Sequence, residues 1–120
     1  MNFKTDIPIY RQIADFCISR ILSGAWPPGQ KVPSVREMAV QMAVNTHTVL
    51  KAFEFLQQHH LIESRRGMGY FLADDAKERV NQLRREEFFT LRLSELFAEM
   101  EMLGIDIADI DRCWDSRKKQ

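Results

Sequence analysis

The side chains with the clearest chemical potential in this chain are polar and cationic groups gathered at residues 45–51. Asn45, Thr46, His47 and Thr48 follow one another, and Lys51 comes shortly after them. Amide, hydroxyl, imidazole and ammonium groups can form hydrogen bonds with the base edges exposed in a DNA groove. The same stretch is also compatible with the polar first turn of an ordinary amphipathic surface helix.

A second group combines arginines with glycines. Arg65 and Arg66 are followed directly by Gly67 and then, after one intervening residue, by Gly69. Guanidinium groups bind phosphate oxygens, and glycine permits positive φ angles and close approach of a backbone. A glycine-rich loop that binds a nucleotide phosphate precedes a helix, whereas this one precedes an extended run. We therefore interpret the glycines as part of a turn and not as a nucleotide-binding loop.

Catalytic and metal-binding chemistry has little support in the sequence. None of the histidines, His47, His59 and His60, stands beside a cysteine, serine or carboxylate cluster that suggests a nucleophile, and metal-ligand spacing is absent. Cys17 and Cys113 are far apart in apolar helical contexts, so both are expected to be buried and unpaired. The sequence predicts neither an enzyme, nor a metal site, nor a cofactor, and it identifies no small-molecule effector.

The polar group at residues 45–48 is expected to begin a helix over residues 44–60. Asn45 can act as the N-cap, because its side-chain oxygen can accept a hydrogen bond from a free backbone N–H. Apolar residues at the helical period form the opposite, buried face of this helix: Val49, Ala52, Phe53 and Leu56. A helix with such a polar leading edge can enter the major groove of DNA.

A short helix is predicted directly before this one. Ser34 and Glu37 have the spacing of a capping box, in which each side chain binds a backbone N–H at the helix start. A tight connection at residues 43–45 then joins the two helices in a helix-turn-helix pattern. Arg36 lies in the first turn of the earlier helix, where it either contacts a phosphate or remains a solvated surface residue.

Two further elements complete the N-terminal part of the chain. Two short extended runs, residues 61–65 and 70–72, flank the tip Arg66–Gly69 and predict a β-hairpin. Placed after a helix-turn-helix, such a hairpin is a wing, and its arginines suit contact with phosphates or a minor groove. At the N-terminus a further helix is expected, with Asp6 as its cap and Gly24 at its end.

The C-terminal part, residues 74–120, is acidic and helical. It contains 9 Lys/Arg against 12 Asp/Glu, whereas residues 1–73 contain 8 against 5, so the basic part carries the candidate DNA-binding helix. A long helix with a broad apolar face and a short returning helix opened by Asp106 cannot bury that face between them. A second small core or a dimer interface could cover it, and we favour the dimer. The interface residues are expected to be Phe89, Leu93, Leu96, Phe97, Met100, Leu103, Ile107, Ile110 and Trp114.

These motifs together resemble the DNA-binding domain of the GntR family of bacterial transcription regulators. The resemblance rests on Pro8–Ile13, Gly24–Ala39, Val44–Phe53 and Arg65–Phe71, and it covers residues 6–73 in register. The last two segments are similar to the YtrA subfamily in particular. The short two-helix C-terminus agrees with this, since YtrA-like regulators carry a small helical dimerisation region where larger members carry a ligand-binding domain.

The resemblance implies a homodimer that binds a palindromic operator in double-stranded DNA. The residues implied to touch DNA are Arg36, Asn45, Thr46, His47, Thr48, Lys51, Arg65, Arg66, Gly67 and Gly69. The subfamily commonly has proline and then asparagine where Thr46 and His47 stand here, so no operator sequence is transferred. Many members also have an arginine early in the recognition helix. None occurs between Arg36 and Arg65, so base contacts are expected from Asn, Thr, His and Lys side chains.

The expected fold class is mainly α with a small β-hairpin. A winged helix-turn-helix domain is expected over residues 1–73 and a helical dimerisation region over residues 74–120. Neither a membrane-spanning stretch nor a secretory signal is recognised, so the expected location is cytoplasmic. The leading hypothesis is a sequence-specific DNA-binding transcription regulator that represses an operon. The alternative is a winged-helix protein-interaction module without DNA binding, which the paired arginines of the wing disfavour.

Overall fold

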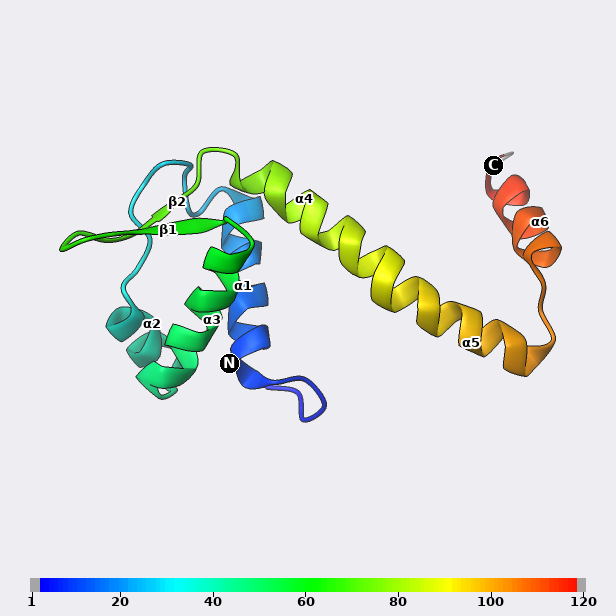
Figure 1. Cartoon of the computed structure of the whole chain (residues 1–120), viewed down its shortest axis with the longest axis horizontal. Coiled ribbons are helices and arrows are strands. Elements are labelled where there is room, and N and C mark those ends of the chain that lie inside the picture. Colours follow the sequence, from blue (N-terminus) through cyan, green and yellow to red (C-terminus); the bar gives the residue numbers. More distant parts are fainter. Residues whose placement is uncertain (1–2, 119–120) are drawn as a thin grey trace. The chain divides into compact units, whose positions relative to one another are not determined.

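The computed structural model of the chain describes residues 3–118 and contains two compact units (Figure 1). The first unit ends at Leu83 and the second begins at Arg84, within helix α4 (Ala76–Glu87). Among the described residues, no helix combines the length and the apolar character that a membrane span requires.

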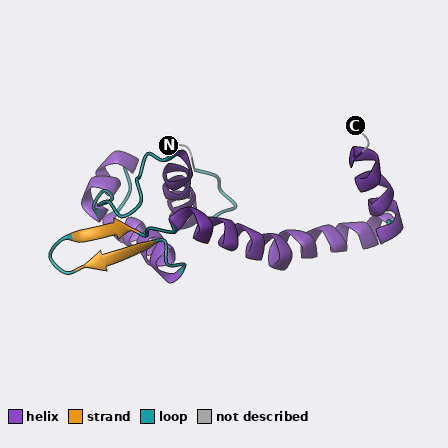
Figure 2. Cartoon of the chain, turned by 90° about the horizontal axis from the view of Figure 1, so that it is seen from above, coloured by secondary structure: helices purple, strands orange, loops and turns teal. Residues whose placement is uncertain are grey.

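The first unit combines three helices, a two-stranded antiparallel hairpin and the first turns of α4. In chain order the elements before α4 are α1 (Ile9–Ser23), α2 (Val35–Met42), α3 (Thr46–Gln58), β1 (Ile62–Arg65) and β2 (Gly69–Leu72). Figure 2 shows the two strands, in orange, together with these helices. The fold class predicted from the sequence, mainly α with a small β-hairpin in a winged helix-turn-helix domain, is confirmed.

Helix α3 is central to the core of this unit, since it packs against both α1 and α2. Its buried residues are the four apolar ones predicted at the helical period: Val49, Ala52, Phe53 and Leu56. The Phe53 ring meets the Tyr70 ring of β2 edge to face, with centroids 5.0 Å apart, which ties the hairpin to α3. Cys17 of α1 is buried in the same core, and burial raises the pKa of its thiol to about 12, so the thiol stays protonated and packs as an apolar group.

The two helices of the helix-turn-helix have the caps that the sequence predicts, although α3 spans Thr46–Gln58 and is shorter at both ends than the predicted residues 44–60. Ser34 Oγ accepts a hydrogen bond from Glu37 N at 3.1 Å, and Ser34 N donates to Glu37 Oε1 at 3.3 Å, so the capping box is confirmed. Asn45 is the N-cap of α3, and its Oδ1 accepts a hydrogen bond from His47 N at 2.8 Å. Between the helices, Ala43 adopts a left-handed conformation with φ of 55°, which ends α2 and turns the chain into α3.

The start of α1 differs from the prediction. Pro8 and not Asp6 is the N-cap, and no side chain caps the helix. The buried Gln12 side chain instead holds the preceding segment, since it accepts from Lys4 N at 2.8 Å and donates to two backbone carbonyls there. A contact of this kind depends on how the segment folds back, which the spacing of cap residues does not show. The end of α1 at Gly24, with φ of 82°, is as predicted.

A third segment of chain extends the hairpin, which the sequence did not predict. Residues 30–32 pair with β2 through two backbone hydrogen bonds, one of 3.0 Å donated by Val32 N and one of 2.9 Å accepted by Gln30 O. Lys31 lies opposite Phe71 in this pairing. The segment follows directly on a proline-rich turn, where a strand is not expected from sequence.

The hairpin has an inner face toward the core and an outer face toward solvent. Ile62 and Leu72 are paired across the strands and are buried. Glu63 lies opposite Phe71, and Arg65 lies two residues further along β1. Because side chains alternate along a strand, these last three residues share the outer face.

The first turns of α4 belong to the first unit. Ala76, Val80 and Leu83 are buried in its core. The compact unit therefore extends beyond residue 73, where the sequence placed the domain boundary. Helical spacing shows which residues share a face, but not which core covers that face. The assignment of DNA binding and dimerisation to either side of residue 73 stays a prediction.

The second unit is helical throughout its described part. After the end of α4 it contains η1 (Phe88–Arg92), α5 (Leu93–Leu103) and α6 (Ile107–Lys118). The short η1 is a π-helix, in which Leu93 N donates to Phe88 O, and the sequence did not predict it. Gly104 ends α5 with φ of 67°. Asp106 and Asp109 each accept a hydrogen bond from the backbone N–H of the other at 3.0 Å, which confirms the predicted start of α6.

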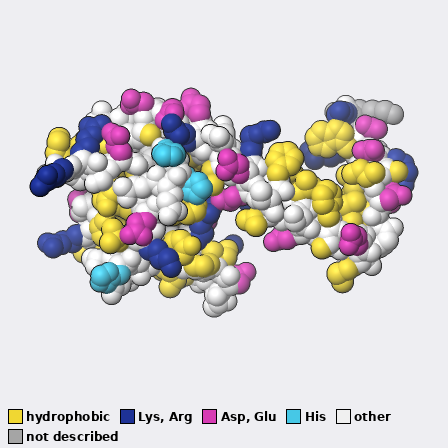
Figure 3. All heavy atoms as spheres, viewed as in Figure 1, with side chains coloured by type: hydrophobic (Ala, Val, Ile, Leu, Met, Phe, Trp, Pro, Cys, Tyr) yellow, Lys and Arg dark blue, Asp and Glu magenta, His cyan; other side chains and the backbone are white. Residues whose placement is uncertain are grey.

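Most large apolar side chains of the second unit are exposed. Met100 is buried, whereas Leu93 and Ile110 are half-buried. The exposed ones are Phe88, Phe89, Leu91, Leu96, Phe97, Met102, Leu103, Ile107 and Trp114. Figure 3 shows hydrophobic side chains, in yellow, on the surface of this unit. Cys113 is exposed as well, which corrects the expectation that both cysteines are buried, because nothing within residues 84–118 covers its side of α6.

Candidate nucleic-acid interface

The start of α3 presents the polar residues expected to face DNA. Thr46 and His47 are exposed, and Thr48 is half-buried. Asn45 is also exposed, but its Oδ1 is already the acceptor of the helix cap. Its amide NH₂ makes no hydrogen bond within residues 3–118 and can donate to a base. The groups most available to a base edge are therefore the Thr46 hydroxyl, the His47 imidazole and the Asn45 amide donor.

Two of the expected phosphate-binding cations lie on the helices of this motif. Arg36, in the first turn of α2, is exposed and forms no ion pair within residues 3–118. The exposed Lys51 lies one turn into α3, with its Nζ 4.5 Å from the centre of the Tyr10 ring of α1. This cation–π contact restrains the ammonium group without neutralising its charge. Both cations are thus available to a polyanion.

The tip of the wing has the backbone conformation that the glycines predict. Gly67 and Gly69 adopt positive φ angles of 72° and 97°. Arg66 and Met68 are exposed at this tip, and in the part of the chain that the structure describes Arg66 forms no ion pair. The Arg66 guanidinium is therefore free to bind a phosphate.

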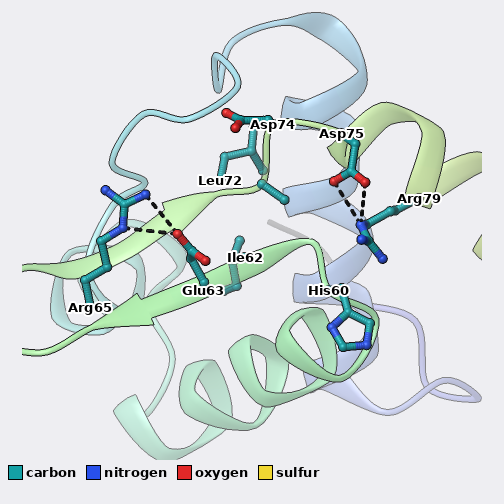
Figure 4. Close-up of a pocket in the computed structure, with 9 residues that line it drawn as sticks. His60, Ile62, Glu63, Arg65, Leu72, Asp74, Asp75 and Arg79 are labelled. Carbon is teal, nitrogen blue, oxygen red and sulfur yellow. Dashed lines mark hydrogen bonds and ion pairs between the residues drawn. The ribbon is translucent and has the colours of Figure 1, made fainter.

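The neighbouring Arg65 is bound within its own hairpin. Its Nε and Nη2 donate to Glu63 Oε1 at 3.1 and 2.8 Å. Its guanidinium carbon also lies 4.0 Å from the centre of the Phe71 ring. Figure 4 shows the Arg65 guanidinium turned toward the Glu63 carboxylate. The two consecutive arginines thus have different surroundings, which the sequence alone does not distinguish.

A polar hollow of about 460 Å³ lies at the base of the wing, between the hairpin and the start of α4 (Figure 4). Its charged groups are partly paired with one another, and Arg79 Nε binds both carboxylate oxygens of Asp75 at 2.9 Å. This hydrogen bonding holds the pKa of Asp75 below its usual range. None of the lining residues comes from α2 or α3, so the hollow is separate from the leading edge of α3.

The winged helix-turn-helix of this chain matches a known protein family over nearly its full length. Residues 9–72 match the family of bacterial regulatory proteins named gntR. The chain belongs to the GntR family. The resemblance drawn from the sequence motifs is confirmed, and the matched residues include α1, α2, α3 and both strands of this GntR protein.

Two relatives from Bacillus subtilis narrow the assignment. The uncharacterized HTH-type transcriptional regulator YhcF is 39% identical over 108 residues, which cover 85% of this chain and 89% of YhcF. The HTH-type transcriptional repressor YtrA is 39% identical over 74 residues, which cover 62% of this chain and 57% of YtrA. The YtrA subfamily expected from the sequence is confirmed for this GntR protein.

Solved structures share the fold and connect it with DNA. A transcriptional regulator assigned to the GntR family from Bacteroides thetaiotaomicron has a TM-score of 0.74 at 36% identity, covering 92% of this chain and 96% of that chain. The DNA-binding domain of AraR, solved in complex with operator ORR3, has a TM-score of 0.55 at 33% identity, covering 61% of this chain and 88% of that chain. This GntR protein is a DNA-binding transcription regulator.

The structure places all the expected DNA-facing residues in the first unit, on α2, at the start of α3 and on the wing. Two further residues lie beside these side chains in the structure and were not among the site residues predicted from the sequence. Tyr10 contacts Lys51, and Lys31 lies beside β2. Both placements arise from tertiary packing, and the only sequence signal for Lys31 was its charge shortly before the α2 capping box. The DNA contacts of the individual residues stay predictions.

Proposed function

We propose that this GntR protein represses transcription by binding a palindromic operator as a homodimer. The observation that carries the proposal is the exposed polar start of α3, which shares one compact unit with Arg36 and Arg66, two cations that form no ion pair among the described residues. The repressor YtrA and the operator complex of AraR support it. We place the activity in the cytoplasm, where bacterial chromosomal DNA lies, and assign no catalytic step to it.

The proposed contacts divide into base reading and phosphate binding. Helix α3 enters the major groove with its N-terminal residues at the bases, as recognition helices do. Thr46 and His47 supply most of the selectivity, since their hydroxyl and imidazole groups are exposed and uncommitted. Arg36, Lys51 and Arg66 bind phosphates, which fixes the register of the protein on DNA and supplies most of the affinity.

The exposed apolar side chains of the second unit support the homodimer. Leu96, Phe97 and Trp114 are 42%, 46% and 56% exposed. Complete burial of a side chain of this size contributes about 1.5–3 kcal/mol, so association of two such surfaces is favourable. A two-fold symmetric dimer presents two copies of α3, which matches the two inverted half-sites of a palindrome.

Selection of bound fragments from a genomic DNA library tests the proposal. We expect the enriched fragments to share two inverted half-sites. A His47→Ala variant should select an altered sequence, because a base contact is lost, with a change of about 1–3 kcal/mol in discrimination. An Arg66→Ala variant should bind all fragments more weakly and keep the same preference, because a phosphate contact carries no sequence information. Failure to enrich any sequence would refute the proposed function.

A further inference from the structure

The outer face of the wing carries two cations that point in different directions. Arg65 belongs to the end of β1 next to the tip, yet its guanidinium turns toward Glu63 and Phe71, nearer the base of the hairpin (Figure 4). Lys31 enters the same sheet from the side of β2, opposite Phe71. Since paired residues in an antiparallel sheet project to the same face, Lys31 shares the outer face with Arg65.

The Lys31 side chain extends along β2 toward the tip. A Cβ built on Gly69 would lie 3.1 Å from Lys31 Cε and 3.7 Å from Lys31 Nζ. Gly69 is the residue of β2 that pairs with Arg65, next to the exposed tip. Because Gly69 has no side chain, the aliphatic part of Lys31 can pass over it. The ammonium group of Lys31 therefore lies close to the tip of the wing.

The charge of Lys31 is also uncompensated. Lys31 is exposed and forms no ion pair within residues 3–118. Glu37 lines the same surface hollow as Lys31, but its carboxylate accepts the hydrogen bond from Ser34 N in the capping box. Arg65, in contrast, has a carboxylate oxygen within 2.8 Å. Before Arg65 binds a phosphate it must give up this partner, whereas Lys31 has none to give up.

We propose that Lys31, rather than Arg65, joins Arg66 in binding DNA phosphates at the wing. This inference rests on the proposed function. Lys31 precedes α2 in the sequence, so its position beside the wing becomes apparent only in the folded chain. The first turn of α2, which carries Arg36, follows Lys31 by a few residues in the chain, and the ammonium group of Lys31 lies beside Gly69 at the wing tip. The proposed contact therefore places a second cation, which forms no ion pair among the described residues, beside the wing tip that carries Arg66.

The test measures the affinity of the full-length chain for a fluorescently labelled duplex of mixed sequence at a series of salt concentrations. Each phosphate contact contributes about 0.9 to the slope of log K against log salt, so loss of one contact in each subunit of a dimer lowers the slope by about 1.8. Lys31→Ala should show this loss, and Lys31→Arg should keep the wild-type slope. Arg65→Ala should also keep it, because Arg65 makes no such contact.

Lys77→Ala is the matched control, since it removes an exposed lysine from α4 of the same unit and should leave the slope unchanged. Thermal unfolding of each variant establishes that it is folded. A wild-type slope for Lys31→Ala, or an equal loss for Arg65→Ala, would overturn the inference while leaving the proposed function intact. Absence of DNA binding by the wild-type chain would instead overturn both.

Discussion

Glu63 and Arg65 project from the same face of β1, and one carboxylate oxygen accepts two guanidinium hydrogen bonds. Both side chains are about half exposed, so the pair contributes only about 0–1 kcal/mol to the free energy of unfolding. Its influence on a polyanion is greater, because a carboxylate beside a cation cancels much of the local attraction for phosphates. We infer that the main effect of Glu63 is to lower the affinity of the wing for DNA, and that its contribution to the free energy of unfolding is small.

A Glu63→Gln variant tests this role. Release of Arg65 should add about 0.9 per subunit to the salt slope for a mixed-sequence duplex and raise the affinity at low salt. Glu78→Gln, on the exposed surface of α4, removes the same charge away from the wing and serves as the control. Equal slopes for the two variants would contradict the prediction. The double variant Glu63→Gln/Arg65→Ala should return to the wild-type slope.

Single residues were predictable from sequence where their roles depend on near neighbours in the chain. The cap at Asn45 and the positive φ of Gly67 follow from local rules and are confirmed. The pairing of Arg65 with Glu63 and the position of Lys31 were not predicted, because they depend on which strand pairs with which and on rotamers of long side chains. Sequence therefore identified cations near the wing but not which of them is free.

At the level of elements, the turn between α2 and α3 contains an unusual residue. Ala43 adopts φ of 55°, a conformation that costs a residue with a Cβ about 1–2 kcal/mol. Ala43→Gly should therefore stabilise the protein by about 0.5–1 kcal/mol after allowance for the greater entropy of glycine in the unfolded chain. Chemical denaturation monitored by circular dichroism measures the difference.

The same substitution within α2 provides the comparison. Ala39 lies in the helix interior, where glycine costs about 1 kcal/mol relative to alanine, so Ala39→Gly should destabilise the protein. Opposite signs for the two variants would support the conformational explanation. Destabilisation by both would show that the Ala43 methyl group contributes packing that outweighs its backbone strain.

The elements that the sequence predicted are those with strong local signals. The capping box and the apolar period of α3 defined the helix-turn-helix, and two short runs around glycines defined the hairpin. The strand segment at residues 30–32 was missed because it is too short to show alternation and because its partner, β2, lies far away in the sequence. The π-helix Phe88–Arg92 was missed because one widened turn leaves the helical period nearly unchanged over short windows.

At the level of the whole molecule, the proposed dimer depends on the apolar surface of the second unit. Leu96→Glu places a charge on that surface and should convert the dimer to monomers, since burial of an unpaired carboxylate is costly. Loss of the second half-site contact should weaken operator binding by about 10²–10⁴-fold. Analytical ultracentrifugation and fluorescence anisotropy measure the two effects.

Glu99→Gln is the control for this experiment, because it changes an exposed polar residue of the same helix α5. It should leave both the mass in solution and the operator affinity unchanged. A dimer that persists in Leu96→Glu would place the interface elsewhere, whereas a monomer with wild-type operator affinity would show that one subunit is sufficient for binding.

The family and the architecture were predictable because several independent motifs agree in register over the winged helix. The C-terminal end of the first compact unit was not predictable from the sequence. Val80 and Leu83 continue the same apolar helical spacing as the residues after them, so the sequence does not show to which unit they belong. Only the folded chain shows that these two side chains complete the core of the first unit. The spacing of apolar residues along a helix therefore does not show at which residue one compact unit ends and the next begins.

The chain has two tryptophans, and one lies in each unit: Trp26 is buried in the first and Trp114 is exposed in the second. Indole fluorescence is blue-shifted in apolar surroundings and is quenched by small solutes where solvent reaches the ring. The quenchable, red-shifted part of the emission therefore belongs to the second unit. The protein thus contains a separate optical reporter for each unit, so that association of chains can be followed without attaching a dye.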